Sequence, residues 1–241
     1  MLQINDLPMT DAAYDAVWAL NEAAGANAHI RGAIQRARDD ARRPHGEVVR
    51  LIATLDGTPV GHAGAFPLVS YAGPGRRYCQ LAVHPDHQGR GVGRALLQAL
   101  LARLPDAREL LGQLRAGDAR ARRVLDHLGG VVGSEDLEQR LLLADADVAR
   151  LEALAGRLAA LGLRVVPLAR LKAEVPDWVA RLHRLHVGLD EDVPSPVDHE
   201  PPDLDAWAAA ELGVPDARHD ALFLALDGDA WVGVCELRQP G

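Results

Sequence analysis

Short segments in which apolar and polar residues alternate are separated along this chain by longer segments in which apolar residues recur every three or four positions. The first pattern is typical of half-buried strands, and the second of helices with one buried face. In the first 144 residues the patterns predict strands at 2–7, 47–55, 60–70, 81–83 and 109–115, and further extended segments around Val131 and at 138–143. They predict helices at 10–20, 28–43, 95–104 and 119–128.

The order of these elements, β-α-α-β-β-β-α-β-α-β, predicts an α/β (α+β) fold with a mixed sheet. Most neighbouring strands are expected to be antiparallel, because short turns such as Asp56-Gly57-Thr58-Pro59 join them. One strand-helix-strand connection predicts a single parallel crossover, and helices are expected on both faces of the sheet.

The second half of the chain repeats the pattern of the first. An amphipathic helix at 147–162 is expected to connect two units, and it is followed by a strand at 163–168, a helix through Trp178 and Val187, a helix at 204–212 and a hairpin formed by 222–226 and 231–238. A repeat of this length predicts a tandem of two similar domains. The predicted parts are a first domain at 1–144, a connector at 145–162 and the N-terminal part of a second domain at 163–241.

The two predicted hairpins can be aligned. Leu55-Asp56-Gly57 is matched with Leu226-Asp227-Gly228, and Gly61 with Gly233, if one residue is inserted. The second domain ends before any counterpart of the strand at 81–83, so it is expected to be incomplete. Its open sheet edge predicts packing against the first domain or against another copy of the chain, as in a homodimer.

The stretch from Cys79 to Leu104 carries the most specific motif. An apolar strand leads through Val83-His84-Pro85 into Gln88-Gly89-Arg90-Gly91-Val92-Gly93, and a leucine-rich helix follows at once. The first turn of a helix has unpaired N–H groups and a partial positive charge, which together favour a phosphate or diphosphate. The Walker and dinucleotide-binding patterns fit less well, because the first needs Lys before Ser or Thr and the second needs G-x-G-x-x-G.

This motif resembles that of the GNAT acetyltransferase superfamily, in which Gln/Arg-x-x-Gly-x-Gly/Ala follows a strand and Val-x-Pro. Gln88, Gly91 and Gly93 match it without gaps. The resemblance implies that acetyl-CoA is the acyl donor, that amides within 89–94 bind its diphosphate and that strand 81–83 pairs with its pantetheine arm. The cofactor-binding residues implied are Leu81, Ala82, Val83, Gln88, Gly89, Arg90, Gly91, Val92, Gly93, Arg94 and Asp118. The alternative is a glycine-rich turn that only joins a strand to a core helix.

The groups that usually transfer protons in this family are replaced here. Gln113 stands at the position of the family's Glu base, Asp118 at that of its Asn, and Leu125 at that of its Tyr acid. Gln cannot act as a base near neutral pH, and Leu offers no proton. The candidate replacements are Tyr78, His84 and Cys79, of which Tyr78 and His84 are preferred as catalytic residues. Their alternative roles are a sheet aromatic, a turn residue and a buried thiol.

Composition narrows the class of partner and the compartment. The formal net charge of −8 argues against nucleic acid, and no apolar run is long enough to span a membrane. The two cysteines form no disulfide or zinc pattern, so a cytoplasmic location is expected. His183 and His186 have a spacing that metal ligands can have, but a surface or interface role is favoured, and no metal is predicted.

The sequence therefore predicts an acetyl-CoA-dependent N-acetyltransferase that moves an acetyl group to a small-molecule amine by direct attack. The tandem organisation is similar to that of tandem GNAT proteins, of which mycothiol synthase is one kind. Two alternatives stay open: a non-catalytic acyl-CoA-binding or regulatory protein, and chemistry that belongs to a missing second half.

Overall fold

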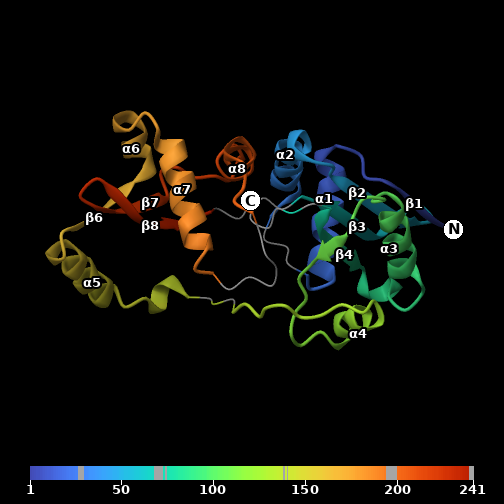
Figure 1. The fold of residues 1–241 in the computed structure, drawn as a ribbon. Helices are drawn as coiled ribbons and strands as arrows, with labels where there is room; N and C mark the ends of the chain where they lie inside the picture. Colours follow the sequence, from blue (N-terminus) through green and yellow to red (C-terminus); the bar gives the residue numbers. More distant parts are fainter. Residues whose placement is uncertain are drawn as a thin grey trace. The chain divides into compact units, whose positions relative to one another are not determined.

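The contacts in the computed structural model divide the chain into two compact units, each with its own sheet (Figure 1). The first comprises Met1–Val131 and Asp198–Ala217, and the second comprises Val132–Val197 and Arg218–Gln239. The segment 198–217, which the sequence pattern places in a second domain, thus groups with the first unit. The structure describes residues 1–26, 30–67, 73, 75–137, 139, 141–193 and 200–238.

The first unit contains a five-stranded sheet in the order β1-β2-β3-β4-β5. Its strands are β1 (Leu2–Asp6), β2 (Val49–Leu55), β3 (Thr58–Phe66), β4 (Arg76–Val83) and β5 (Glu109–Leu111). Neighbours are antiparallel except β4 and β5, which are parallel. The predicted mixed, mostly antiparallel sheet with one parallel crossover is confirmed. The third strand is predicted to extend to Ser70, but residues 68–70 lie outside the described residues.

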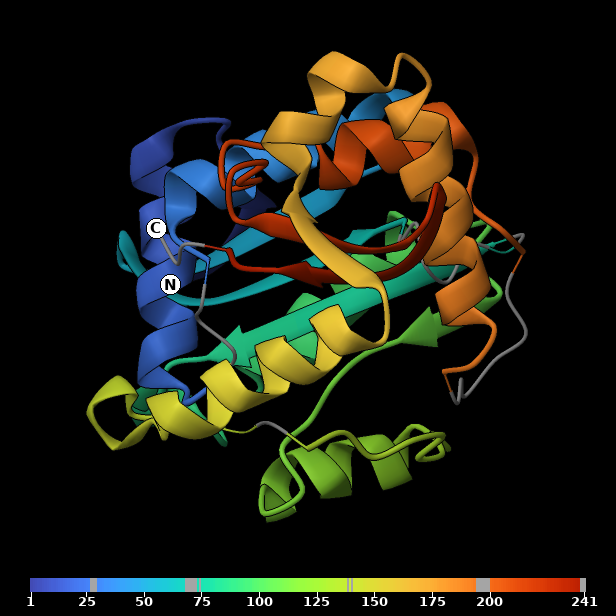
Figure 2. The same ribbon diagram turned by 90° about the vertical axis from the view of Figure 1, so that its left-hand side faces the viewer.

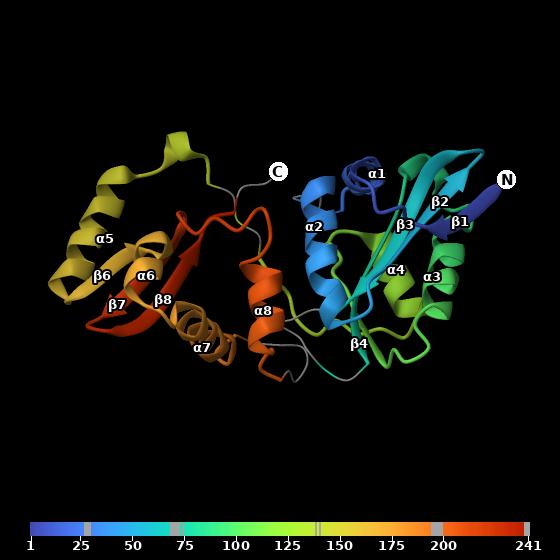
Figure 3. The same cartoon turned by 90° about the horizontal axis from the view of Figure 1, so that it is seen from above.

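Helices cover both faces of this sheet, as predicted (Figure 3). On one face α1 (Asp11–Ala23) packs against Ile52 through Tyr14, Val17 and Leu20. On the other, α3 (Val92–Ala102) packs against an apolar cluster that includes Leu51. Leu51 and Ile52, which are adjacent in β2, thus pack into the cores on opposite faces of the sheet, because side chains alternate along a strand.

The predicted ends of the first two helices differ little from the observed ones. Thr10 caps α1 by accepting a hydrogen bond from the Ala13 N–H, as its position predicts. Beside α1 lies α2 (Gly32–Arg42), which continues into a 3-10 turn, η1 (Arg43–His45). The predicted start of this second helix, Ala28, lies outside the described residues.

The prediction of two more extended segments after the last helix of the first domain is wrong for the residues that the structure describes. β5 has three residues rather than seven, and α4 (Ala119–His127) follows it. No strand is present in the described residues of 129–147, and Leu143–Asp145 forms a 3-10 turn, η4. A strand needs a neighbour with which to pair, and the segment's Val131, at 86% exposure, packs against none. The positions 138 and 140 lie outside the described residues.

The second unit contains a three-stranded antiparallel sheet in the order β6-β7-β8 (Figure 2). Its elements are α5 (Val148–Ala160), β6 (Leu163–Pro167), α6 (Leu168–Glu174), α7 (Trp178–Asp190), β7 (Leu222–Asp227) and β8 (Ala230–Glu236). The strands and the two longer helices match the predicted segments. The short helix α6 was not predicted, because its seven residues give too few periods for a pattern to be recognised.

The hairpins β2-β3 and β7-β8 share an irregularity. In the first the register shifts by one residue after Ala53, and in the second it shifts after Ala225. In both, the residue before the shift pairs with a glycine, Gly61 or Gly233, and two residues form the turn. The predicted match of the two glycines agrees with this register. The predicted inserted residue does not, because the two hairpins have the same length between bulge and turn.

The helix α8 (Leu204–Glu211) packs beside α2 within the first unit (Figure 3). Trp207 on this helix is buried, and the nearby Asp216 forms a two-point ion pair with Arg38 of α2, at 2.5 and 3.3 Å. Trp207 is therefore a core residue, and its segment, which the sequence pattern assigns to the second domain, belongs by contacts to the first unit.

Candidate active site

Strands β4 and β5 separate halfway along β4. Their pairing joins Arg76–Tyr78 to Glu109–Leu111, and from Cys79 to Val83 β4 pairs, among the described residues, with β3 and not with β5. The His84 N–H donates to the Val60 carbonyl of β3, so alternate residues of β4 direct their main-chain groups toward β3. The intervening residues, including Leu81 and Val83, direct theirs toward the opposite, open edge. This edge could pair with an extended ligand as a strand does.

The glycine loop is fastened to the end of β4. A 3-10 turn, η3 (Pro85–His87), follows the strand, and the Gln88 amide Nε2–H donates to the Val83 carbonyl at 2.9 Å. Gly89 and Gly91 are exposed and have φ angles of +76° and +83°. A Cβ atom at either position would meet nothing within 4 Å. The left-handed backbone, rather than lack of space inside the protein, therefore requires glycine at both.

The N-terminus of α3 presents main-chain donors to the loop. Gly91 is its N-cap and supplies no side-chain bond, and the first intrahelical bond runs from the Ala95 N–H to the Gly91 carbonyl at 3.0 Å. The N–H groups of the first three helical residues, Val92, Gly93 and Arg94, precede that bond and have no partner within the helix. No group in the described part of the chain accepts from them. They are placed to bind an anion.

Tyr78, a predicted catalytic residue, is the last residue of β4 that is paired with β5. Burial, followed by the nearby Cys79, raises the pKa of its phenol. Its ring packs against Phe66, with the ring centroids 5.4 Å apart. The phenol therefore stays protonated at neutral pH, at the point where the two strands separate, and can serve as a proton donor.

His84, the other predicted catalytic residue, has its Nδ1 committed. This atom accepts a hydrogen bond from the Asp86 N–H at 3.3 Å. The neutral ring then carries its proton on Nε2, which can donate but not accept. The geometry fits a proton donor or hydrogen-bond donor better than a general base.

Cys79 lies on the opposite face of β4, since it pairs with Ala65 in the register that serves the α3 core. Burial raises the pKa of its thiol to about 11. The nucleophilic thiolate is scarce at neutral pH, so the structure favours the role of a buried small side chain.

The three residues at the family's usual positions take structural or solvent-facing places. Gln113 is exposed beyond the end of β5, and Leu125 is a half-buried residue of α4. The Asp118 carboxylate caps α4 by accepting from the Arg120 and Ala121 N–H groups, both at 2.9 Å. Within the described residues none of the three forms a hydrogen bond or ion pair with Tyr78 or His84.

A buried charged network lies between α2 and the sheet, and the sequence pattern did not predict it. The Asp39 carboxylate is fully buried and accepts two hydrogen bonds from Arg50 of β2, at 2.8 and 3.0 Å. The Tyr14 hydroxyl donates to it at 2.9 Å, and Gln35 at 3.0 Å. The sequence signal was Arg50 itself, a single charge inside an otherwise apolar strand. Its partner on α2 could not be read from spacing.

The network sets the charge state of its members. Burial tends to raise the pKa of Asp39, but the hydrogen bonds and charge of Arg50, with Arg42 and Tyr14, outweigh it and leave that pKa below its usual range. Burial and the Asp39 carboxylate raise the pKa of the Tyr14 hydroxyl. Both groups therefore hold their ordinary charge near neutral pH, and the Asp39–Arg50 pair is ionised.

His62 of β3 is a second buried polar group on the same face of the sheet. Its Nε2–H donates to the Asn21 Oδ1 at 2.7 Å, and its Nδ1 has no partner among the described residues. Burial, followed by the charge of Arg50, lowers its pKa to about 3. This imidazole therefore stays neutral and is a poor base near neutral pH.

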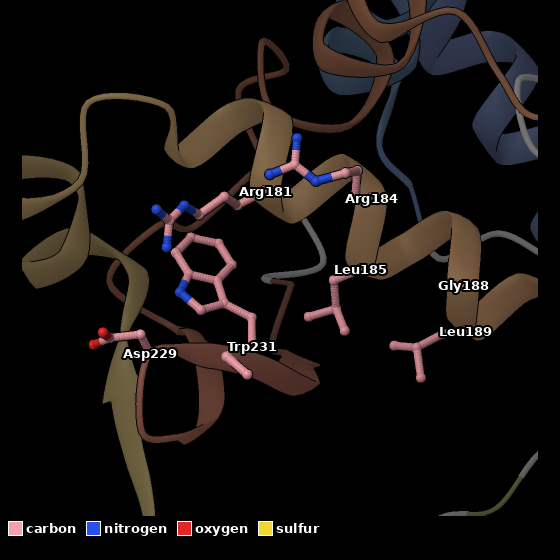
Figure 4. A pocket seen from close by; sticks show the side chains of 8 residues that line it. Arg181, Arg184, Leu185, Gly188, Leu189, Asp229 and Trp231 are labelled. Carbon is pink, nitrogen blue, oxygen red and sulfur yellow. The ribbon is translucent and has the colours of Figure 1, made fainter.

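A cavity of about 430 Å³ lies within the second unit, between α7 and the β7-β8 turn (Figure 4). None of its lining residues belongs to the glycine loop. They are Arg181, Arg184, Leu185, Gly188, Leu189, Asp229, Ala230 and Trp231.

Within the described residues, no group of three or more His, Cys, Asp or Glu side chains could hold a metal ion. His183 and His186, both on α7, are therefore not part of such a group. Among the described helices, none has both the length and the apolar character needed to cross a bilayer.

The sequence profile described as the Acetyltransferase (GNAT) family matches residues 14–129. These residues form a GNAT acetyltransferase domain. The matched range covers most of the first unit, with the open edge of β4, the glycine loop and α3. None of the curated proteins matches the chain.

Solved structures similar to the chain include the ribosomal-protein-S18-alanine N-acetyltransferase from Escherichia coli, at 23% identity over 54% of this chain and 77% of that one, with a TM-score of 0.43. An aminoglycoside acetyltransferase from an uncultured soil metagenomic sample, in complex with sisomicin, shares 17% identity over 59% and 96%, with a TM-score of 0.45. A transcriptional regulator from Bacillus halodurans C-125 shares 16% identity over 58% and 100%, with a TM-score of 0.45.

Proposed function

We propose that the first unit is an acetyl-CoA-dependent N-acetyltransferase whose acceptor is a small-molecule amine. The observation that supports this most is the placement of the unpartnered N–H groups of Val92, Gly93 and Arg94 directly after an open strand edge. The amides would hold the diphosphate of the donor, and the edge at Leu81 and Val83 would pair with its pantetheine arm. Binding of the diphosphate at the Val92, Gly93 and Arg94 amides would break no hydrogen bond within the described part of the protein.

The proposed reaction is a direct attack of the amine nitrogen on the thioester carbon. A C–N bond forms, the C–S bond breaks, and the nitrogen loses a proton to solvent. The Tyr78 phenol would donate a proton to the departing thiolate and regain one from water. No buried carboxylate base is assigned, so the acceptor enters as the free amine, and the rate should rise with pH as the amine deprotonates.

Release of free CoA during incubation with a panel of amines, measured with a thiol reagent, tests this proposal. Turnover above the rate of acetyl-CoA hydrolysis supports it. Binding of acetyl-CoA with no turnover on any amine would favour the rival function, a non-catalytic acyl-CoA-binding or regulatory protein. The observation in favour of that rival is the exposed Gln113 at the position of the family's base.

We also propose that the chain is of the tandem GNAT kind, with the second unit repeating elements of the first. The shared bulge of the hairpins β2-β3 and β7-β8, with a glycine directly after the bulged residue in both, supports this organisation. Within the described residues β8 pairs only with β7, whereas its counterpart β3 pairs with strands on both sides. We propose that this edge forms a homodimer contact, which a mass measurement by light scattering tests. Chemistry in a second complete domain remains the other alternative.

The proposed compartment is the cytoplasm. Both cysteines, Cys79 and Cys235, are free thiols. Free thiols are usual where the compartment is reducing.

A further inference from the structure

The side chain of Gln80 lies on the face of the sheet that α1 and α2 cover. Gln80 is the first residue on this face after β4 and β5 separate. Tyr78, on the same face, makes the last pair with β5, and Cys79 between them faces the α3 core. Side chains of a strand stand roughly perpendicular to the sheet, whereas a ligand paired with the strand edge lies within its plane. The Gln80 side chain is therefore placed to meet the acceptor rather than the donor's arm.

The orientation of the Gln80 amide is fixed from behind. The Arg50 Nη1–H donates to the Gln80 Oε1 at 2.8 Å. The guanidinium is in turn held by two bonds to the buried Asp39 carboxylate, and its side chain is only 2% exposed. Because Arg has only donors, it fixes the oxygen of the amide toward itself. The Gln80 Nε2 then has two hydrogens to donate, and no group in the described residues accepts from them.

The sequence leaves room for this arrangement at Gly64, which pairs with Gln80 across β3 and β4. A Cβ atom there would lie 2.6 Å from the Arg50 Nη1 and 2.9 Å from its Cδ. Glycine at this position thus allows the Arg50 guanidinium to pass over β3, on one face of the sheet, and reach Gln80 of β4. Its φ is not positive, so the need for glycine here is one of space alone.

We propose that Gln80 is an acceptor-binding residue whose Nε2–H donates to an oxygen atom of the acceptor. The preferred acceptor is then an amine that carries a hydroxyl, ether or carbonyl oxygen near its nitrogen. This inference rests on the proposed function. Arg50 and Asp39 act through Gln80 as positioning residues. Truncating the network would release the amide to rotate, and a rotated amide would present its oxygen instead of its donor.

The test compares pairs of amines of similar size, ethanolamine with propylamine and glucosamine with cyclohexylamine, as substrates of the full chain. Gln80→Glu keeps an oxygen for Arg50 but replaces the donor with a second oxygen. Gln80→Met removes both polar atoms at similar length. Gln98→Glu, on the exposed side of α3, is the matched control. Urea unfolding of each variant reports any loss of the fold.

Both Gln80 variants should raise the KM for the oxygen-bearing amines about fivefold and leave that for the alkylamines within twofold, since a hydrogen bond to a neutral partner contributes about 1 kcal/mol. Gln98→Glu should leave all four amines unchanged. An equal change for both members of a pair, or a fall in kcat alone, overturns the inference and assigns Gln80 to the fold or to the thioester. A chain that binds acetyl-CoA but acetylates none of the oxygen-bearing amines also overturns it. Failure to bind acetyl-CoA overturns the proposed function itself.

Discussion

Replacing Asp39 with Ala should destabilise the first unit more than any surface change. The carboxylate accepts five hydrogen bonds, two of them from Arg50 and the others from Tyr14, Gln35 and Arg42. The variant would leave the Arg50 guanidinium charged and only 2% exposed, without its anion. Breaking a buried pair by removing one partner costs about 3–5 kcal/mol. That is a large fraction of the roughly 5–15 kcal/mol by which a domain is stable.

Urea unfolding followed by circular dichroism measures this loss as a fall in the midpoint at constant slope. The neighbouring Asp40→Ala is the matched control, because its side chain is 47% exposed and pairs with Arg36 and Arg43 at the surface. Exposed pairs contribute roughly 0–1 kcal/mol. A double variant, Asp39→Leu with Arg50→Met, removes both charges and should cost less than Asp39→Ala alone.

Equal losses of stability in Asp39→Ala and Asp40→Ala would show that the buried network contributes no more to stability than a surface ion pair. A double variant less stable than Asp39→Ala would show that hydrogen bonds of Arg50 to other groups, rather than the uncompensated charge, dominate.

Three further predictions follow from single groups. The unfolded chain binds a proton at His62 near pH 6.5, whereas the folded chain does so only near pH 3, so the folded state loses stability as pH falls below 6.5. Urea unfolding should show a loss of about 2 kcal/mol between pH 7 and pH 5. The His62→Gln variant should not show this loss. Tyr78→Phe should lower kcat at least tenfold with an unchanged KM for acetyl-CoA in steady-state assays, and an unchanged kcat would exclude the phenol as proton donor. Gly64→Ala should displace Arg50 and reproduce the KM effect of Gln80→Met, whereas wild-type kinetics would show that the crowding is relieved elsewhere.

Most of the fold could be predicted because its signals are local. Thr10 marks a helix start through its own side chain, and Asp56-Gly57 marks a turn through its positive φ angles, 49° and 84°. The glycine loop was found for the same reason, since the strand, loop and helix are adjacent in sequence. The prediction of extended segments after α4 is wrong for the described residues because a short apolar run such as Leu141–Leu143 shows that a strand could form, not that a partner strand exists.

The candidate site was predictable only where it is built from one stretch. The cofactor loop is such a stretch, but the face that would meet the acceptor is assembled from separate elements. Asp39 and Arg50 come together only because a helix packs on a strand, and the direction of Gln80 depends on both. Likewise Asp216 pairs with Arg38 across 178 positions of sequence. No periodicity specifies such pairings, which follow from tertiary packing.

Calorimetric titration with acetyl-CoA of wild type, Gly91→Glu and Gly57→Glu tests whether the amides at the start of α3 bind the diphosphate of the donor. The two glycines have φ angles of +83° and +84°, and a Cβ atom at either would meet nothing within 4 Å, so the two substitutions impose similar backbone strain. Only Gly91 precedes the unpartnered amides of α3, where a carboxylate would repel the diphosphate. Gly57→Glu should bind acetyl-CoA like wild type, and Gly91→Glu should not bind it. Wild-type affinity in Gly91→Glu would show that these amides do not hold the diphosphate.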